Sequence, residues 1–142
     1  MIDREAIYER LRSLEEYLRI LEGWRGLSLE EFVSSPANYW PVQHGLQLCI
    51  QVLLDVGNHL IASLALAAPR DYHDVIVKLG EHGIIPRDFA AQIAPMAGFR
   101  NILVHEYLAV DLAEVYRILR ERLDDFRLFA AHVERFLEEN EG

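Results

Sequence analysis

The chain has 142 residues, a net charge of −9 and one cysteine. That length suits a single domain with its own hydrophobic core, so we expect residues 1–142 to form one domain. The acidic charge argues against broad electrostatic attraction to nucleic acid, and any RNA contact must therefore be local or shared with a partner. Cys49 lies in an apolar run and can form no internal disulfide, which indicates a packed thiol in a reducing compartment. The amino terminus lacks an apolar targeting segment, so we expect a cytoplasmic protein.

Helical periodicity is clear from the start of the chain. Apolar residues spaced three and four apart predict a helix over residues 7–21, and Gly23 is a plausible stop. Ser28, followed three residues later by Glu31, forms a capping-box pattern that predicts a short helix ending at Val33. The apolar stripe of the first helix consists of Ile7, Leu11, Leu14, Leu18 and Leu21.

The next predicted helix is long and nearly free of charge. After the break at Ser34-Ser35-Pro36, we expect it to run from Tyr39 or Pro41 to Ala67, because proline is tolerated in a first turn. Its length would span a membrane, but an acidic residue near the middle, Asp55, is costly in hydrocarbon, and we expect no membrane span.

On a helical wheel the polar side chains of this helix fall in one sector of roughly 120°. A solvent-facing side would normally be rich in Lys and Glu, so amides and imidazoles indicate a shielded polar cleft or a subunit interface. A satisfied internal hydrogen-bond network is the alternative, and the sequence leaves both open. The polar residues are His44, Gln47, Gln51, Asp55, Asn58 and His59.

Asp55 and His59 are four residues apart on this helix. The carboxylate could therefore hold the imidazole in one tautomer, in support of a catalytic helix. The pair could also be half of a metal site, and a metal-dependent hydrolase built on Asp55, His59 and His105 is a third functional class that chelator sensitivity would reveal. The six histidines show no clear tetrahedral ligand spacing, so we expect no metal and no cofactor.

The second half of the chain also reads as helical. We expect a helix over residues 72–79, and another that begins at Pro86, kinks at Pro95 and carries residues 100–107 near its end. A further helix should begin after a capping-box pattern at Asp111 and run to about residue 138. With no convincing strand, the predicted fold is all-α, an up-and-down bundle of four to five helices.

The stretch Arg100-Asn101-Ile102-Leu103-Val104-His105-Glu106-Tyr107 combines groups suited to phosphodiester chemistry. The Arg100 guanidinium offers a planar fork of donors for phosphate oxygens, and His105 can exchange protons near neutral pH. On an ideal helix His105 is rotated about 140° from Arg100, so one helix does not focus both on one atom. Two copies meeting about a dyad could line one groove with both residues. The alternative is a solvated arginine and a histidine that simply favours a helix C-terminus.

This stretch resembles the RX4-6H motif of HEPN domains and, with Tyr107, the R-x4-H-x-Y form of HepT-like toxins. The resemblance extends to helix number, motif position, the Asp-capped final helix and length. It implies a HEPN-like, dimeric or larger ribonuclease toxin that needs no metal and is paired with a minimal nucleotidyltransferase antitoxin. It also implies that Arg100, Asn101 and His105 are catalytic and that Tyr107 accepts AMP groups from the partner. Residues Gln51, Asp55, Asn58 and His59 are then expected to support the cleft or interface.

The sequence leaves a second functional class open. The chain could be a non-catalytic HEPN binding or scaffold module that partners a nucleotidyltransferase, and its acidic charge is compatible with that role. Toxicity on expression that is relieved by His105→Ala would favour the ribonuclease.

Overall fold

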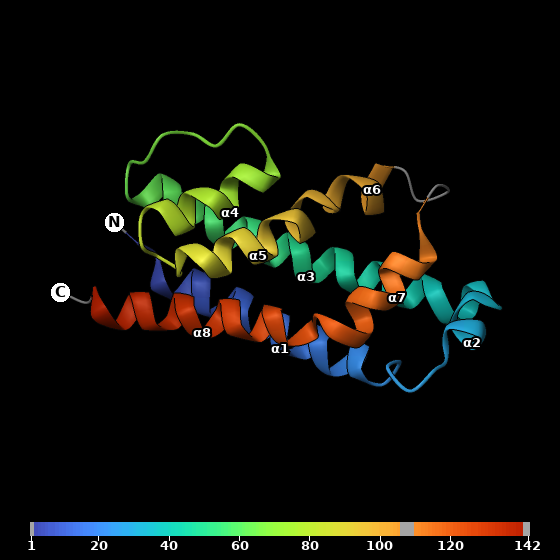
Figure 1. Ribbon diagram of the computed structural model, residues 1–142. Coiled ribbons are helices and arrows are strands. Elements are labelled where there is room, and N and C mark those ends of the chain that lie inside the picture. The colour runs from blue at the N-terminus through green and yellow to red at the C-terminus, as the bar shows by residue number, and fades with distance from the viewer. Residues whose placement is uncertain (1, 106–109, 141–142) are drawn as a thin grey trace.

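The computed structural model describes residues 2–105 and 110–140, and within these ranges all regular structure is helical (Figure 1). Two neighbouring pairs, α5 with α6 and α7 with α8, each form one broken rod, and these two rods together with α1, α3 and α4 make a bundle of five, beside the short helix α2. The predicted all-α bundle is therefore confirmed. In Figure 1, α1 and the α5–α6 rod run in one direction, and α3 and the α7–α8 rod run in the other. The helices are α1 (Arg4–Glu22), α2 (Leu29–Val33), α3 (Pro36–Ser63), α4 (Tyr72–Glu81), α5 (Arg87–Gly98), α6 (Arg100–His105), α7 (Leu112–Glu121) and α8 (Leu123–Glu139).

Helix α3 is the central element, because it contacts every other helix of the described chain. Its apolar side is buried in the shared core. By length and composition α3 is also apolar enough to cross a membrane, and more than half of its most apolar window is buried inside the protein. A helix in this position satisfies its apolar surface against neighbouring helices, as expected for the core helix of a bundle.

Several local signals form the structures that the sequence predicts. Helix α1 ends at Gly23, and its expected apolar stripe is buried. Both hydrogen bonds of the Ser28–Glu31 capping box are present at 3.0 and 3.1 Å. Asp111 caps α7, but the Glu114 carboxylate accepts from Arg117 at 2.6 Å instead of closing a box. Short-range polar chemistry therefore sets these helix ends.

The predicted bounds of α3 were wrong at both ends. The helix begins earlier, at Pro36, because the Ser35 hydroxyl accepts from the Ala37 N–H at 3.2 Å and proline suits the first turn. It ends at Ser63, where the chain turns through Ala65 with a φ of 55°. The Leu66 N–H donates to the Ile61 carbonyl at 3.0 Å across this turn, the pattern of a left-handed helix cap made without glycine.

Two helices predicted as continuous are broken. The motif-bearing helix divides at Phe99 into α5 and α6, whereas Pro95 lies inside α5. The final helix divides at Arg122 into α7 and α8. Arg122 donates to the Gln92 carbonyl at 3.0 Å and pairs with Asp125 at 3.2 Å. One contact reaches across to α5 and the other is local, and apolar periodicity carries no trace of either.

Two glycines let α3 approach its neighbours closely. A Cβ at Gly45 would lie 2.7 Å from the Leu21 side chain of α1, and one at Gly57 would lie 2.6 Å from Val75 of α4. The second contact places the start of α4 beside the polar side of α3, where the motif of α6 also arrives.

Candidate functional site

The motif lies on the short helix α6, directly after the break at Phe99. Leu103 is buried in the core and anchors α6, which contacts α3 and α5. Arg100 begins this helix and His105 ends it. The His105 side chain and Tyr107 lie outside the described residues, so the structural description of the motif concerns Arg100 and Asn101.

The Arg100 side chain is half-buried and contacts three other side chains. Its Nε donates to Gln51 Oε1 on α3 at 3.2 Å, and its Nη1 donates to Asn101 Oδ1 at 3.4 Å. Its guanidinium also lies over the Tyr72 ring at the start of α4, with 4.9 Å from Cζ to the ring centroid, a cation–π distance. Three helices therefore converge on one guanidinium and hold its orientation.

A second layer of polar contacts supports Gln51. Its Nε2 donates to Asp55 Oδ1 at 2.9 Å, one turn along α3. Asp55 Oδ2 in turn pairs with Arg10 Nε of α1 at 3.7 Å, and both side chains are partly exposed. Because an amide can flip, the Asp55 contact matters: it makes the amide nitrogen face Asp55 and the amide oxygen face Arg100. The order Arg10–Asp55–Gln51–Arg100 thus connects α1 to α6 through α3.

The remaining residues of the expected cleft have separate positions. His59 Nε2 accepts from the backbone N–H of Asp3 at 3.2 Å, and Asp55 is engaged by Gln51 and Arg10. Asp55 and His59 thus have separate partners, and no hydrogen bond or ion pair joins them among the described residues. Asn58 is exposed and lines a pocket that it shares with Asn101. The polar side of α3 is thus part internal network and part open surface.

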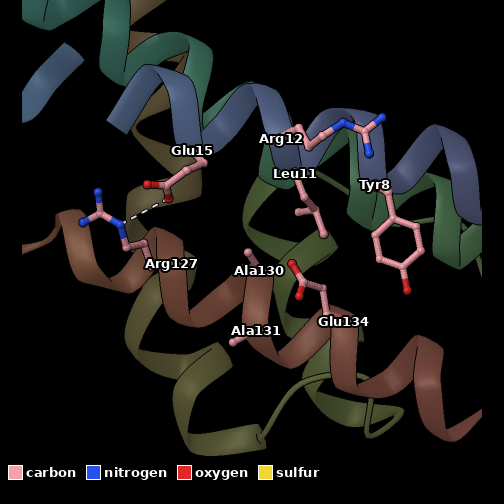
Figure 2. Close-up of a pocket in the computed structure, with 8 residues that line it drawn as sticks. All are labelled: Tyr8, Leu11, Arg12, Glu15, Arg127, Ala130, Ala131 and Glu134. Carbon is pink, nitrogen blue, oxygen red and sulfur yellow. Dashed lines mark hydrogen bonds and ion pairs between the residues drawn. The ribbon is translucent and has the colours of Figure 1, made fainter. Parts of the chain in front are cut away.

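That pocket, of about 350 Å³, lies between α3, α4 and α6, directly beside Arg100. A separate groove of about 350 Å³ lies between α1 and α8, where the small side chains of Ala130 and Ala131 leave space (Figure 2). An ion pair between Glu15 and Arg127 at 3.3 Å crosses this second groove. No described motif residue lines this groove, whereas Asn101 lines the pocket beside Arg100.

Sequence reasoning missed two members of the site. The sequence predicts Tyr72 only as the first residue of a helix, and it singles out Arg10 for no role. Tyr72 directly follows the helix cap Asp71, whose side chain accepts from the Asp74 N–H at 2.8 Å, so the predicted helix start at residue 72 is confirmed, whereas its contact with Arg100 has no sequence signal. No sequence signal connects Arg10 with Asp55. Within residues 2–105 and 110–140, no three His, Cys, Asp or Glu side chains gather in a way that suits a metal ion.

The arrangement presents a permanent cation in a fixed orientation, with an amide at its side. Such a group can bind a phosphate oxygen through the Nη hydrogens that no described residue accepts, and can stabilise negative charge that grows there. Because its Nε is already bonded to Gln51, the guanidinium needs little reorganisation when an anion arrives.

A family model described as Ribonuclease HepT-like matches residues 7–133. The tRNA nuclease HepT of Aphanizomenon flos-aquae is 29% identical over 136 residues, which cover 96% of this chain and 92% of that protein.

Two solved structures are similar in fold. The cytosolic protein YutE of Bacillus subtilis has a TM-score of 0.84 at 22% identity, over 97% of this chain and 92% of its own. The tri-AMPylated HEPN toxin of Shewanella oneidensis, in complex with an MNT antitoxin, has a TM-score of 0.82 at 23% identity, over 95% of this chain and 99% of its own. At these identities the two likenesses establish the fold.

Proposed function

The chain belongs to the HepT-like ribonuclease family, and we propose that it is the ribonuclease toxin of a toxin–antitoxin pair, acting in the cytoplasm. The observation that carries this proposal is the Arg100 guanidinium, which Gln51 and Tyr72 hold at the start of the motif helix. A ribonuclease needs a preorganised cation at the phosphate, and an arginine that was merely solvated would not need contacts from two other helices.

The proposed reaction is attack of a ribose 2′-OH on the adjacent phosphorus. The new O2′–P bond forms while the P–O5′ bond breaks, which leaves a 2′,3′-cyclic phosphate and a 5′-hydroxyl. His105 takes the proton from the 2′-OH or supplies one to the leaving 5′ oxygen, and Arg100 stabilises the charge on the phosphoryl oxygens. Asn101 orients the substrate or His105. The nucleophile belongs to the RNA itself, so this route uses no metal ion.

We place the active groove between two protomers. Because Arg100 and His105 are separated by about 140° around an ideal helix, a dyad that brings two α6 helices together gives one phosphate access to both residue types. One His105 can then act as base and its copy as acid. Sedimentation analysis of wild type and His105→Ala tests this arrangement: both should be dimers or larger, and a monomeric active enzyme would contradict it.

The proposed partner is a minimal nucleotidyltransferase antitoxin that transfers AMP to Tyr107. Tyr107 is two residues from His105, so an added AMP group brings bulk and negative phosphate charge close to the catalytic residue. That charge opposes the RNA phosphates and blocks their entry. Co-expression with a nucleotidyltransferase encoded beside this chain should add mass in units of AMP to Tyr107 and reduce cleavage, and Tyr107→Phe should resist both effects.

The decisive functional experiment separates an enzyme from a binding module. Cleavage of single-stranded RNA by purified wild type, with the 2′,3′-cyclic phosphate identified by mass spectrometry, supports the ribonuclease. His105→Ala should abolish cleavage and relieve toxicity on expression, while its melting temperature and oligomeric state stay close to wild type. RNA left intact at high concentration of AMP-free protein would instead favour the non-catalytic module, a role compatible with the net charge of −9.

A further inference from the structure

The pocket beside Arg100 shares two lining residues, Tyr72 and Asn101, with the contacts of the guanidinium. Its volume of about 350 Å³ falls at the lower end of the range of about 300–1,000 Å³ for small-molecule sites. It is formed by the C-terminal half of α3, the segment that precedes α4, the first turn of α4 and the start of α6. Its lining residues are Asn58, Pro69, Arg70, Asp71, Tyr72, Val75 and Asn101.

The lining combines one aromatic ring and one buried valine with several polar groups. Val75 is buried and Tyr72 is half-buried, whereas Asn58 and Asn101 are exposed. The Arg70 side chain is 89% exposed, with Asp74 3.7 Å from its Nε. A carboxamide offers both a donor and an acceptor, so two of them can match the hydrogen-bonding edge of a planar heterocycle.

The two amides are available for a ligand. Among the described residues, the Asn58 side chain makes no hydrogen bond, and Asn101 uses its Oδ1 to accept from Arg100 at 3.4 Å. The Asn101 NH₂ group therefore remains free to donate. The Asp71 carboxylate at the rim accepts from the Asp74 N–H at 2.8 Å, and its negative charge disfavours a phosphate on that side.

The pocket adjoins Arg100 through Tyr72 and Asn101, two lining residues that also contact the guanidinium. The guanidinium lies 4.9 Å from the centroid of the Tyr72 ring, and that ring also lines the pocket. A phosphate held by the Nη donors of Arg100 would place an adjoining nucleoside beside Tyr72 and between the two amides. Proteins that read single-stranded RNA use this combination of an aromatic surface and hydrogen bonds to a base edge.

We propose that this pocket binds the nucleobase adjoining the scissile phosphate, with Asn58 as its specificity-determining residue. This inference rests on the proposed ribonuclease function. Tyr72 both orients Arg100 and packs against the base, Asn101 joins the two subsites, and Asn58 contacts only the base. The occupant is a base of a single RNA strand, because a paired base presents neither its face nor its full edge.

The test compares cleavage of single-stranded RNAs that differ only in the base on either side of the mapped cleavage position. Wild type should prefer some bases on one side, measured as kcat/KM. Asn58→Leu, which has a similar shape but no hydrogen-bonding groups, should reduce that preference about 3- to 10-fold. It should leave the least favoured substrate nearly unaffected. The matched control is Gln47→Leu on the same polar side of α3, outside the pocket lining, and it should keep the wild-type preference.

Tyr72 provides a second variant pair. Tyr72→Phe keeps the ring, so its kcat should fall less than that of Tyr72→Leu, which removes both the cation–π contact and the surface for the base. Tyr72→Leu should also lose base preference. A purely structural role for Tyr72 would lower thermal stability and leave the preference among bases unchanged.

Failure of this inference is distinguishable from failure of the ribonuclease proposal. One outcome overturns the pocket and leaves the ribonuclease proposal intact. In it, cleavage depends on Arg100 and His105, but Asn58→Leu either changes nothing or lowers kcat/KM equally for every base. If wild type cleaves none of the RNAs, the ribonuclease proposal fails, and fluorescence anisotropy with the same labelled RNAs decides the pocket. Base-dependent Kd values that Asn58→Leu equalises support it, and Kd values independent of base overturn it.

Discussion

Replacing Gln51 by leucine tests whether catalysis depends on the orientation of Arg100. The change removes the acceptor that lies 3.2 Å from Arg100 Nε, and with it the contact to Asp55 at 2.9 Å. Hydrogen bonds to charged groups contribute about 1.5–3 kcal/mol, and the partial exposure of both side chains favours the lower figure. About 1.5 kcal/mol corresponds to a roughly tenfold fall in rate. We expect this loss in kcat, with a smaller change in KM, because the phosphate-binding Nη groups remain.

The assay is the initial rate of cleavage of a labelled single-stranded RNA, with the melting temperature of each variant measured in parallel. Gln51→Glu keeps an acceptor for Arg100 and should recover part of kcat. It should also raise KM, because a second carboxylate beside Asp55 repels the RNA phosphates. Gln47→Leu, one turn earlier on the same side of α3, is the control. A wild-type kcat in Gln51→Leu, or an equal loss in Gln47→Leu, would refute the positioning role.

Three further predictions concern the scaffold. Gly57→Ala should lower the free energy of unfolding in urea by about 1–3 kcal/mol, because a Cβ there would lie 2.6 Å from a side-chain carbon of α4. A Cβ at Gly98 would meet no such neighbour, so Gly98→Ala should be neutral or stabilising. Equal losses of stability in the two variants would contradict the close approach. The backbone N–H of Arg70 holds the pKa of the Asp74 carboxyl below its ordinary value of 3.8. That carboxylate therefore stabilises the fold above pH 3.8 and loses its contribution as the pH falls through the lowered pKa, so the unfolding free energies of wild type and Asp74→Asn should converge in acid. Burial raises the pKa of the Cys49 thiol to about 12; it should react with a thiol reagent only on unfolding, and rapid labelling of native protein would contradict its burial.

Local chemistry explains which parts of the fold the sequence predicts well. The stripe on α1, the capping box at Ser28 and the cap at Asp111 depend on residues a few positions apart, and all three are confirmed. The breaks at Phe99 and Arg122 are different. Arg122 is held by residues of α5 and α8, and the apolar pattern continues through both breaks, so periodicity predicts unbroken helices.

In the site, too, the sequence predicts neighbours on one helix better than contacts between separate helices. Sequence pattern and family resemblance place Arg100 and Asn101 together on one helix and name Gln51 and Asp55 as expected support for it. The structure shows Gln51 hydrogen-bonded to both Arg100 and Asp55, and the supporting role stays a prediction. The same reasoning paired Asp55 with His59, because only residues on one helix were considered as neighbours. The ion-pair partner of Asp55, Arg10, lies on α1, and Tyr72 contacts Arg100 from α4, which packs closely on α3 at Gly57. The roles of His105 and Tyr107 stay predictions from the motif.

The central claim is a metal-independent ribonuclease that uses Arg100 and His105. Its most direct test is cleavage of labelled RNA in the presence of EDTA by wild type, Arg100→Ala and His105→Ala, with mass spectrometry of Tyr107 on each preparation. We predict wild-type cleavage that survives the chelator and is lost in both variants. Intact RNA with wild-type protein whose Tyr107 carries no AMP, or cleavage that persists in either variant, would contradict the claim.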